Sequence, residues 1–88
     1  MPKTAASEVA SKLVGREIRS ARTELGLTQA QLAGRMGVNP SYITNVEAGR
    51  VNLTVGQLAN IAEALGAGLD IKLVRLDTEP VRLTAALG

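Results

Sequence analysis

This sequence predicts an all-α bundle of short helices followed by a single β-strand. Apolar residues recur at three- and four-residue spacing through most of residues 7–68, and residues 69–76 change to an alternating pattern. Two T-x-x-Q sequences and one Asn-Pro pair provide helix starts. The 88 residues are enough for one small domain. We expect a flexible N-terminus over residues 1–6, a helical domain over 7–68, a dimerisation strand over 69–76 and a tail over 77–88.

The first helix is predicted to begin at Ser7, a residue type that commonly caps helices, and to end at Gly26. Four residues within it fall on one apolar face. They are Val14, Ile18, Ala21 and Leu25.

The second helix is predicted over residues 29–36. Thr28 and Gln31 form a capping box at its start, and Gly37 permits a left-handed turn at its end. Its inward residues are Leu32, Ala33 and Met36.

The third and fourth helices have equally clear starts. Asn39 caps the third helix with Pro40 at its first position, and Gly49 ends it. Thr54 and Gln57 repeat the capping box at the start of the fourth helix, which Gly66 and Gly68 end. The inward residues are Ile43 and Val46 in the third helix, and Val55, Leu58, Ile61, Ala62 and Leu65 in the fourth.

The segment after the fourth helix alternates as a strand does. Apolar and charged side chains alternate along it, and the apolar ones are Leu69, Ile71 and Leu73. Such a strand pairs either with residues 81–84 in a hairpin or with its own copy in a second subunit. We favour pairing in a homodimer, because an isolated hairpin is marginal in water and a core of small aliphatic residues is weak.

Charge and composition limit the function. Residues 1–50 carry seven basic and four acidic side chains, whereas residues 51–88 carry three and four. The basic excess favours a polyanion partner for the first half, although a plain solvated face has the same pattern. Without His or Cys the chain lacks the usual metal cluster, thiol nucleophile or Ser-His arrangement, and it has no Gly-rich phosphate loop. We therefore expect no enzyme, no cofactor and no metal.

No signal peptide and no membrane span is visible in the sequence. The expected location is the cytoplasm of a bacterium or a phage-infected cell, with no membrane partner. The absence of Cys fits a reducing compartment.

Residues 29–46 have the spacing that two crossing helices require. Ala33 permits a close approach of the helices, and Gly37 permits the turn between them. Five further positions at fixed spacing are apolar, namely Leu32, Met36, Val38, Ile43 and Val46. The pattern predicts a helix-turn-helix; the alternative is a helical hairpin that binds nothing.

The stretch LGLTQAQLAGRMGVNPSYITNVEAGR resembles the lambda-repressor-like, Cro/XRE family of DNA-binding domains. The likeness covers roughly residues 12–66 and includes the L-T-Q opening, the I-x-x-x-E sequence of the third helix and the Gly-Arg that follows. It implies a compact helical bundle whose third helix enters the major groove of double-stranded DNA at a palindromic operator.

The resemblance also implies residue roles. Base-reading positions are Asn39, Pro40, Ser41, Thr44 and Asn45, where Asn45 suits adenine and Pro40 departs from the polar residue usual in relatives. Phosphate contacts are Gln29, Tyr42 and Arg50. Tyr42 has a second interpretation, as a cover for the edge of the core. Arg22 and Glu47 form a structural ion pair. Arg19 and Arg35 are expected to be solvated, with a phosphate contact as the alternative.

One helix-turn-helix followed directly by LGAGLDIKLVRL resembles antitoxins of the HipB or HigA type. That likeness implies a dimer that represses its own operon and binds a toxin protein. The alternatives are a free-standing repressor without a toxin and a protein-binding adaptor on the same fold.

Overall fold

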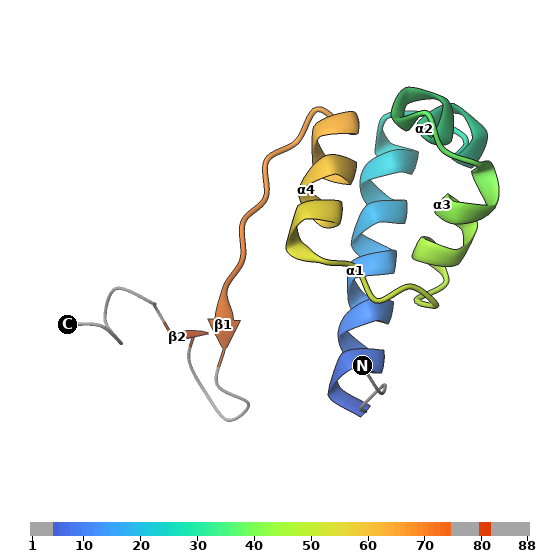
Figure 1. The fold of residues 1–88 in the computed structure, drawn as a ribbon. Coiled ribbons are helices and arrows are strands. Elements are labelled where there is room, and N and C mark those ends of the chain that lie inside the picture. Colours follow the sequence, from blue (N-terminus) through green and yellow to red (C-terminus); the bar gives the residue numbers. More distant parts are fainter. Residues whose placement is uncertain (1–4, 75–79, 82–88) are drawn as a thin grey trace.

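Four helices form the body of the protein in this computed structural model, and a short hairpin lies beyond the fourth (Figure 1). The structure describes residues 5–74 and 80–81. The elements are α1 (Ala5–Glu24), α2 (Gln29–Met36), α3 (Pro40–Glu47), α4 (Val55–Ala64), β1 (Leu73–Val74) and β2 (Pro80–Val81). Figure 1 shows α1 running between α3 and α4, with α2 crossing near its C-terminal end.

Helix α1 begins earlier than predicted. It includes Ala5 and Ala6, so Ser7 lies inside the helix and does not cap it, and the prediction that residues 5 and 6 belong to a flexible N-terminus is wrong. Alanine is the strongest helix former, which explains the extension. Residues 1–4 lie outside the described part of the chain. At the other end the helix stops at Glu24, so Leu25 is exposed and does not share the predicted inward face.

The other helix starts are confirmed. Both predicted capping boxes are complete, because Thr28 and Thr54 each accept a hydrogen bond from the backbone N–H three residues on. In return, the side chains of Gln31 and Gln57 accept bonds from the backbone N–H groups of the two threonines at 2.8 and 2.9 Å. These reciprocal bonds fix both helix starts without any tertiary contact.

The core lies where the four helices meet and consists of small aliphatic side chains. The buried hydrophobic residues are Ile18, Leu32, Ala33, Ile43, Val46, Ile61 and Leu65. All seven were expected to face inward. Like Leu25, Val55 was predicted to face inward and is exposed, because it occupies the first position of α4.

Helix α1 passes close to the backbone of α3 at Gly15. A Cβ atom at this position would lie 2.6 Å from the carbonyl oxygen of Val46 and 2.7 Å from that of Glu47. Only a residue without a side chain fits there, which explains a glycine in the middle of a helix that glycine otherwise destabilises.

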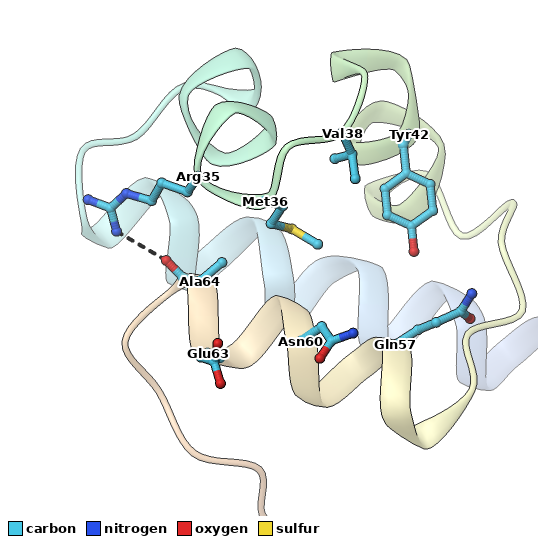
Figure 2. A pocket seen from close by; sticks show the side chains of 8 residues that line it. All are labelled: Arg35, Met36, Val38, Tyr42, Gln57, Asn60, Glu63 and Ala64. Atoms are coloured by element: carbon cyan, nitrogen blue, oxygen red, sulfur yellow. Dashed lines mark hydrogen bonds between the residues drawn. The ribbon is translucent and has the colours of Figure 1, made fainter.

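The turn between α2 and α3 rests against α4 (Figure 2). Met36, Val38 and the half-buried Tyr42 line one side of a hollow of about 470 Å³, opposite Gln57 and Asn60 of α4. The Tyr42 ring therefore covers the edge of the core, as the second interpretation of this residue expected.

The predicted strand over 69–76 begins later in the structure. Residues 69–72 are not in a strand, β1 covers residues 73–74, and residues 75–76 lie outside the described part of the chain. β1 pairs antiparallel with β2 of the same chain, with Leu73 opposite Val81 and Val74 opposite Pro80. A strand needs a partner for its backbone groups, and β2 provides one for these two residues. Pairing with a second subunit remains a prediction.

Candidate nucleic-acid interface

The turn that separates α2 from α3 is fixed by the backbone. Gly37 adopts a left-handed conformation with φ of +67°. Its N–H donates to the carbonyl oxygen of Gly34 at 3.3 Å, and the next N–H, that of Val38, donates to Ala33 at 3.0 Å. The bonds close the C-terminal end of α2 and set the direction in which α3 leaves.

Helix α3 begins with a side-chain cap. The Asn39 side-chain oxygen accepts a hydrogen bond from the Ser41 backbone N–H at 2.9 Å, and Pro40 occupies the first helical position. Because the side-chain oxygen of Asn39 accepts the capping hydrogen bond, the side-chain NH₂ group is the part that remains for a base edge.

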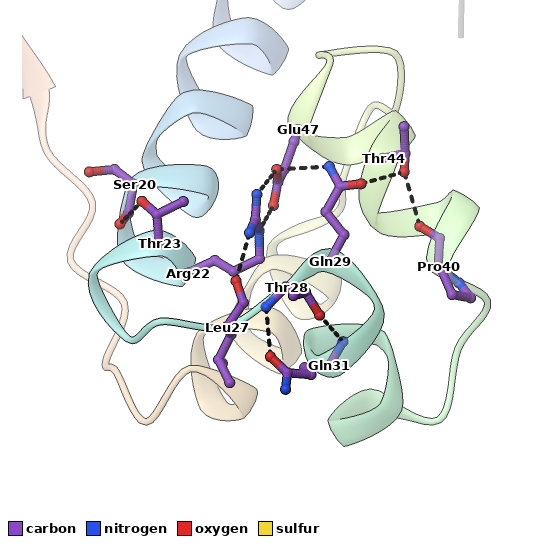
Figure 3. A network of polar contacts seen from close by, with 10 residues as sticks. All are labelled: Ser20, Arg22, Thr23, Leu27, Thr28, Gln29, Gln31, Pro40, Thr44 and Glu47. Atoms are coloured by element: carbon purple, nitrogen blue, oxygen red, sulfur yellow. Dashed lines mark hydrogen bonds and ion pairs between the residues drawn. The ribbon is translucent and has the colours of Figure 1, made fainter.

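A buried ion pair joins α1 to the C-terminal end of α3 (Figure 3). Arg22 Nε donates to Glu47 Oε2 at 2.6 Å, and Arg22 Nη2 donates to Oε1 at 2.9 Å. Arg22 also donates to the carbonyl oxygen of Leu27 at 2.7 Å. The two side chains are 10% and 4% exposed, so the pair is shielded from water and holds α3 in one orientation.

The same network reaches the outer face of α3 through Gln29. Its Nε2 donates to Glu47 Oε1 at 3.1 Å, and its Oε1 accepts from the Thr44 hydroxyl at 2.8 Å. Thr44 Oγ1 also lies 3.3 Å from the carbonyl oxygen of Pro40. Four polar side chains from three helices therefore form one connected chain, which Figure 3 shows.

This network determines the protonation of Glu47. Burial alone would raise the pKa of the Glu47 carboxyl, but the hydrogen bonds from Arg22 and Gln29 and the positive charge of Arg22 hold the pKa below its ordinary value. Arg19 contributes a smaller attraction in the same direction. The carboxylate is therefore ionised at neutral pH, and the network needs that charge.

The outer face of α3 exposes short, uncharged, polar groups. Pro40, Ser41 and Thr44 are exposed, and Asn45 is half-buried. Asn45 Oδ1 accepts a hydrogen bond from Arg50 Nη1 at 3.3 Å, which places a positive charge at the end of this face. The predicted base-reading residues and Arg50 thus come together on α3, at its N-cap Asn39 and in the turn after the helix.

Two other cations were expected to be solvated. Arg19 and Arg35 are both exposed, and Arg35 also donates from Nη1 to the carbonyl oxygen of Ala64 at 3.1 Å. Arg35 therefore binds the C-terminal end of α4, an interaction that the sequence pattern does not reveal.

Sequence reasoning also missed the link from Gln29 to Thr44 and the role of Gly15. The glycine left a signal, because glycine inside a helix is unfavourable and needs a packing reason. The Gln29–Thr44 hydrogen bond has no signal in the sequence, because the two residues are 15 positions apart and both were predicted to contact DNA.

The predicted dimerisation residues lie away from this face, in the segment beyond α4. Leu69, Ile71 and Leu73 are all exposed in the single chain.

Among the described residues, no group of three or more His, Cys, Asp or Glu side chains is placed to hold a metal ion. No helix within the described ranges is long and apolar enough to cross a membrane.

Residues 18–72 match the helix-turn-helix family HTH_3. The chain belongs to this family. The match spans all of α2, α3 and α4 and the part of α1 that carries Arg22, so the family assignment includes the whole network described above.

Curated relatives of this helix-turn-helix chain are regulators. An HTH-type transcriptional regulator of Sinorhizobium fredii, y4dJ, is 44% identical over 55 residues, which are 62% of this chain and 71% of the relative. The immunity repressor protein of Bacillus phage phi105 is 40% identical over 53 residues, 60% of this chain and 37% of that protein.

One relative has a crystal structure in complex with DNA. The restriction-modification controller protein C.Esp1396I, determined as a tetramer with its natural 35 base-pair operator, is 30% identical with a TM-score of 0.62. The likeness covers 75% of this chain and 82% of that one. Together with the family match, these relatives identify a transcriptional regulator with a DNA-binding helix-turn-helix domain of the Cro/XRE type.

Proposed function

We propose that this chain is a sequence-specific repressor that binds an inverted-repeat operator as a two-fold dimer. One observation carries the proposal. The uncharged polar face of α3 is held in a fixed orientation by the network of Arg22, Glu47, Gln29 and Thr44. A face of this kind suits the major groove, where short hydrogen-bonding groups meet base edges while charges meet phosphates.

Within this proposal α3 supplies the base contacts. Asn45 takes an adenine through its amide, and Ser41 and Thr44 meet neighbouring bases or a thymine methyl. Pro40 offers apolar contact alone, and Asn39 adds its amide NH₂. Support comes from the exposure of Asn39, Pro40, Ser41 and Thr44, beside the half-buried Asn45, along one face of α3 and the turn before it.

The phosphate contacts would surround that face. Arg50 is exposed at its end, and Gln29 is the first residue of α2. Because both ends of the Gln29 amide are bonded internally, its backbone N–H at the helix start is the group we assign to the phosphate. Tyr42 is a secondary contact, since its ring is half-buried against the core.

A two-fold dimer would place two copies of α3 in successive major grooves about 34 Å apart on one side of the duplex. Selection of bound duplexes from a random pool tests this directly. We expect an inverted repeat whose half-site centres are separated by about 10 base pairs. Recovery of a single half-site, or of no sequence preference, would contradict the proposal.

The two kinds of contact are separable by substitution. Asn45→Ala is expected to relax the preference at one base pair, with a loss of about 1–3 kcal/mol on the selected site. Arg50→Ala should weaken all duplexes alike and reduce the salt dependence of binding by about one ion. Arg35→Ala is the matched control, because Arg35 binds the end of α4 and should leave the salt dependence unchanged. Identical behaviour of the Asn45 and Arg50 variants would overturn these roles.

We further propose that the repressor acts as the antitoxin of a toxin–antitoxin pair and represses its own operon. The support is the sequence resemblance of the segment after α4 to HipB- and HigA-type antitoxins. Expression of the neighbouring gene alone should arrest growth, and co-expression of this chain should restore it. Normal growth in both cases would leave a free-standing repressor. Failure to bind any duplex even at low salt would instead indicate a protein-binding adaptor.

A further inference from the structure

We infer that α1 supplies a second set of DNA phosphate contacts, through a ridge formed by Lys12, Arg16 and Arg19. In the proposed complex this α1 ridge would continue the backbone contact of Arg50 and bind the duplex without regard to its sequence. The inference rests on the DNA binding of the proposed function and names residues to which that proposal gives no contact. Two of them, Lys12 and Arg16, lie before residue 18, where the family match begins.

Lys12 lies directly against the turn that follows α3. A Cβ atom at Gly49 would lie 2.6 Å from Lys12 Cγ and 2.9 Å from Lys12 Cα. Arg50 follows Gly49 in the chain, and its side chain is exposed at the end of the α3 face. Lys12 and Arg50 therefore flank the same turn from different elements, and α1 adds positive charge to this end of the α3 face.

The other two ridge residues lie on the same side of α1. Residues three and four positions apart share a helix face, so Arg16 lies between Lys12 and Arg19. Gly15 on this side meets the backbone of α3. The positive charge of Arg19 lowers the pKa of the Glu47 carboxyl, so Arg19 also lies toward the C-terminal end of α3. All three ridge residues are exposed.

The acidic residues of α1 lie mainly on its opposite side. Glu17 lines the apolar groove between α1 and α4, whereas the ridge residues, all in the described part of the chain, do not line it. Glu24 shares the side of Glu17, because it lies seven positions further along the helix. Glu8 is the exception and precedes Lys12 by one turn. The positive charge is therefore concentrated on the part of α1 that passes the end of α3, which Figure 1 shows between α3 and α4.

The ridge cations are not neutralised within the chain. Among the described residues, the ion pairs are Arg22 with Glu47 and Lys72 with Asp70, and neither includes a ridge residue. Arg35 is also bound, through the carbonyl oxygen of Ala64. The ridge is thus the group of neighbouring cations that the described fold leaves available to a polyanion.

The length of the ridge suits a stretch of DNA backbone. Seven residues of α-helix rise about 10 Å between Lys12 and Arg19. One strand of a duplex carries a phosphate about every 3.4 Å along its axis. When α3 lies in the major groove, a backbone strand borders each side of the groove, and the ridge beside Arg50 would meet two or three phosphates of one strand.

The salt dependence of binding tests the ridge. Each phosphate contact contributes about 0.9 to the steepness of log K against log salt concentration. The triple variant Lys12→Gln, Arg16→Gln, Arg19→Gln should therefore be less steep by about two to three units, and should bind the selected operator at least about tenfold more weakly at about 0.15 M salt. Glutamine retains a Cγ beside Gly49 and removes the charge.

Single substitutions with equal changes of net charge separate position from charge. Arg16→Gln should reduce the steepness by about one unit. Lys72→Gln is the matched control, because Lys72 lines the groove on the opposite side of α1 and should leave the steepness unchanged. Glu17→Gln, on that same side, should also leave it unchanged. Equal losses from Arg16→Gln and Lys72→Gln would show an effect of net charge alone and overturn the assignment of the ridge.

Ethylation of single phosphates shows where the ridge binds. In the wild type, ethylated phosphates beside the one contacted by Arg50 should prevent binding. The triple variant should become insensitive to ethylation at these neighbouring phosphates and remain sensitive at the phosphate that Arg50→Ala releases. Its base preference in selection from a random pool should be unchanged, because phosphate contacts carry no sequence information. A changed base preference would overturn the backbone role.

The outcomes separate this inference from the proposed function. If the wild type selects an inverted repeat and the triple variant keeps the wild-type salt dependence, the ridge is solvated and the repressor stands. A wild type that binds no duplex overturns both. Chemical denaturation shows whether the triple variant is folded, because Arg19 attracts the buried Glu47. If the triple variant is unfolded, the double variant Lys12→Gln, Arg16→Gln takes its place, with an expected loss of about two units of steepness.

Discussion

The helical body buries both an ion pair and apolar side chains, whereas the segment beyond α4 exposes both kinds. In the body, Arg22 and Glu47 form an ion pair that is almost fully buried and is extended by Gln29 and Thr44. In the segment, Asp70 and Lys72 approach to 3.9 Å in solvent. The body buries seven hydrophobic residues, whereas the apolar residues 69, 71 and 73 are exposed.

This difference shows which region satisfies its polar and apolar groups within one chain and which does not. In the described part of the chain, no buried side-chain polar atom lacks a hydrogen-bond partner, so the DNA-facing unit is satisfied on its own. The segment has apolar groups and backbone edges that one chain leaves in water. The contrast predicts that substitutions in the body affect folding, and that substitutions in the segment affect association.

The largest effect is expected at the buried ion pair. Glu47→Gln leaves the Arg22 charge buried without its counter-charge, which should lower the free energy of unfolding by about 3–5 kcal/mol in chemical denaturation. The matched substitution Asp70→Asn breaks an exposed pair and should cost less than about 0.5 kcal/mol. Similar losses from both would remove the contrast between the two regions.

The next effect concerns the close approach of α1 and α3. Gly15→Ala places a methyl group against two backbone carbonyl oxygens and should lower the free energy of unfolding by about 2 kcal/mol. Gly34→Ala is the control, because no atom outside its local helix lies within 4 Å of a Cβ there, and it should stabilise the protein by up to about 1 kcal/mol. Thermal unfolding of the two variants measures both changes.

Acid should weaken the body through Glu47. Its folded-state pKa is lower than the ordinary value of 4.5, so the carboxylate stabilises the fold fully above that value. The stabilisation is lost as the pH falls through the lower, folded-state pKa. The difference in unfolding free energy between wild type and Glu47→Gln should therefore shrink as the pH falls below about 4.5. A difference that grows in acid would contradict the assigned direction of the pKa.

The smallest effect on folding is expected in the segment. Ile71→Ser should leave the unfolding temperature of a dilute sample unchanged, because Ile71 is exposed in the single chain. At higher protein concentration the wild type should melt at a higher temperature and the variant should not, since only association makes the melting temperature depend on concentration. A loss of stability in dilute samples would place Ile71 within the folding core.

The sequence predicted the features that depend on neighbours along the chain. The capping boxes at Thr28 and Thr54, the Asn39 cap and the turn at Gly37 each involve residues within three or four positions, so their patterns are readable directly. The seven buried hydrophobic residues followed from helical spacing.

The features that the sequence did not predict depend on tertiary contacts. Gly15 is explained by carbonyl groups of α3, and the Gln29–Thr44 bond joins residues 15 positions apart. The strand expected to begin at Leu69 begins at Leu73 because strand formation depends on a partner, which an alternating pattern does not supply.

The hydrogen-bond chain from Glu47 also has a direction. A carboxylate can only accept, so Gln29 must turn its NH₂ toward Glu47 and its oxygen toward Thr44. Thr44 therefore directs its hydroxyl hydrogen inward and presents to a base only lone pairs and a methyl group. In the proposed complex it would accept from the amino group of adenine or cytosine, or contact a thymine methyl, and would disfavour guanine. In that complex, the negative charge buried on the inner side of α3 would help to select the base on its outer side.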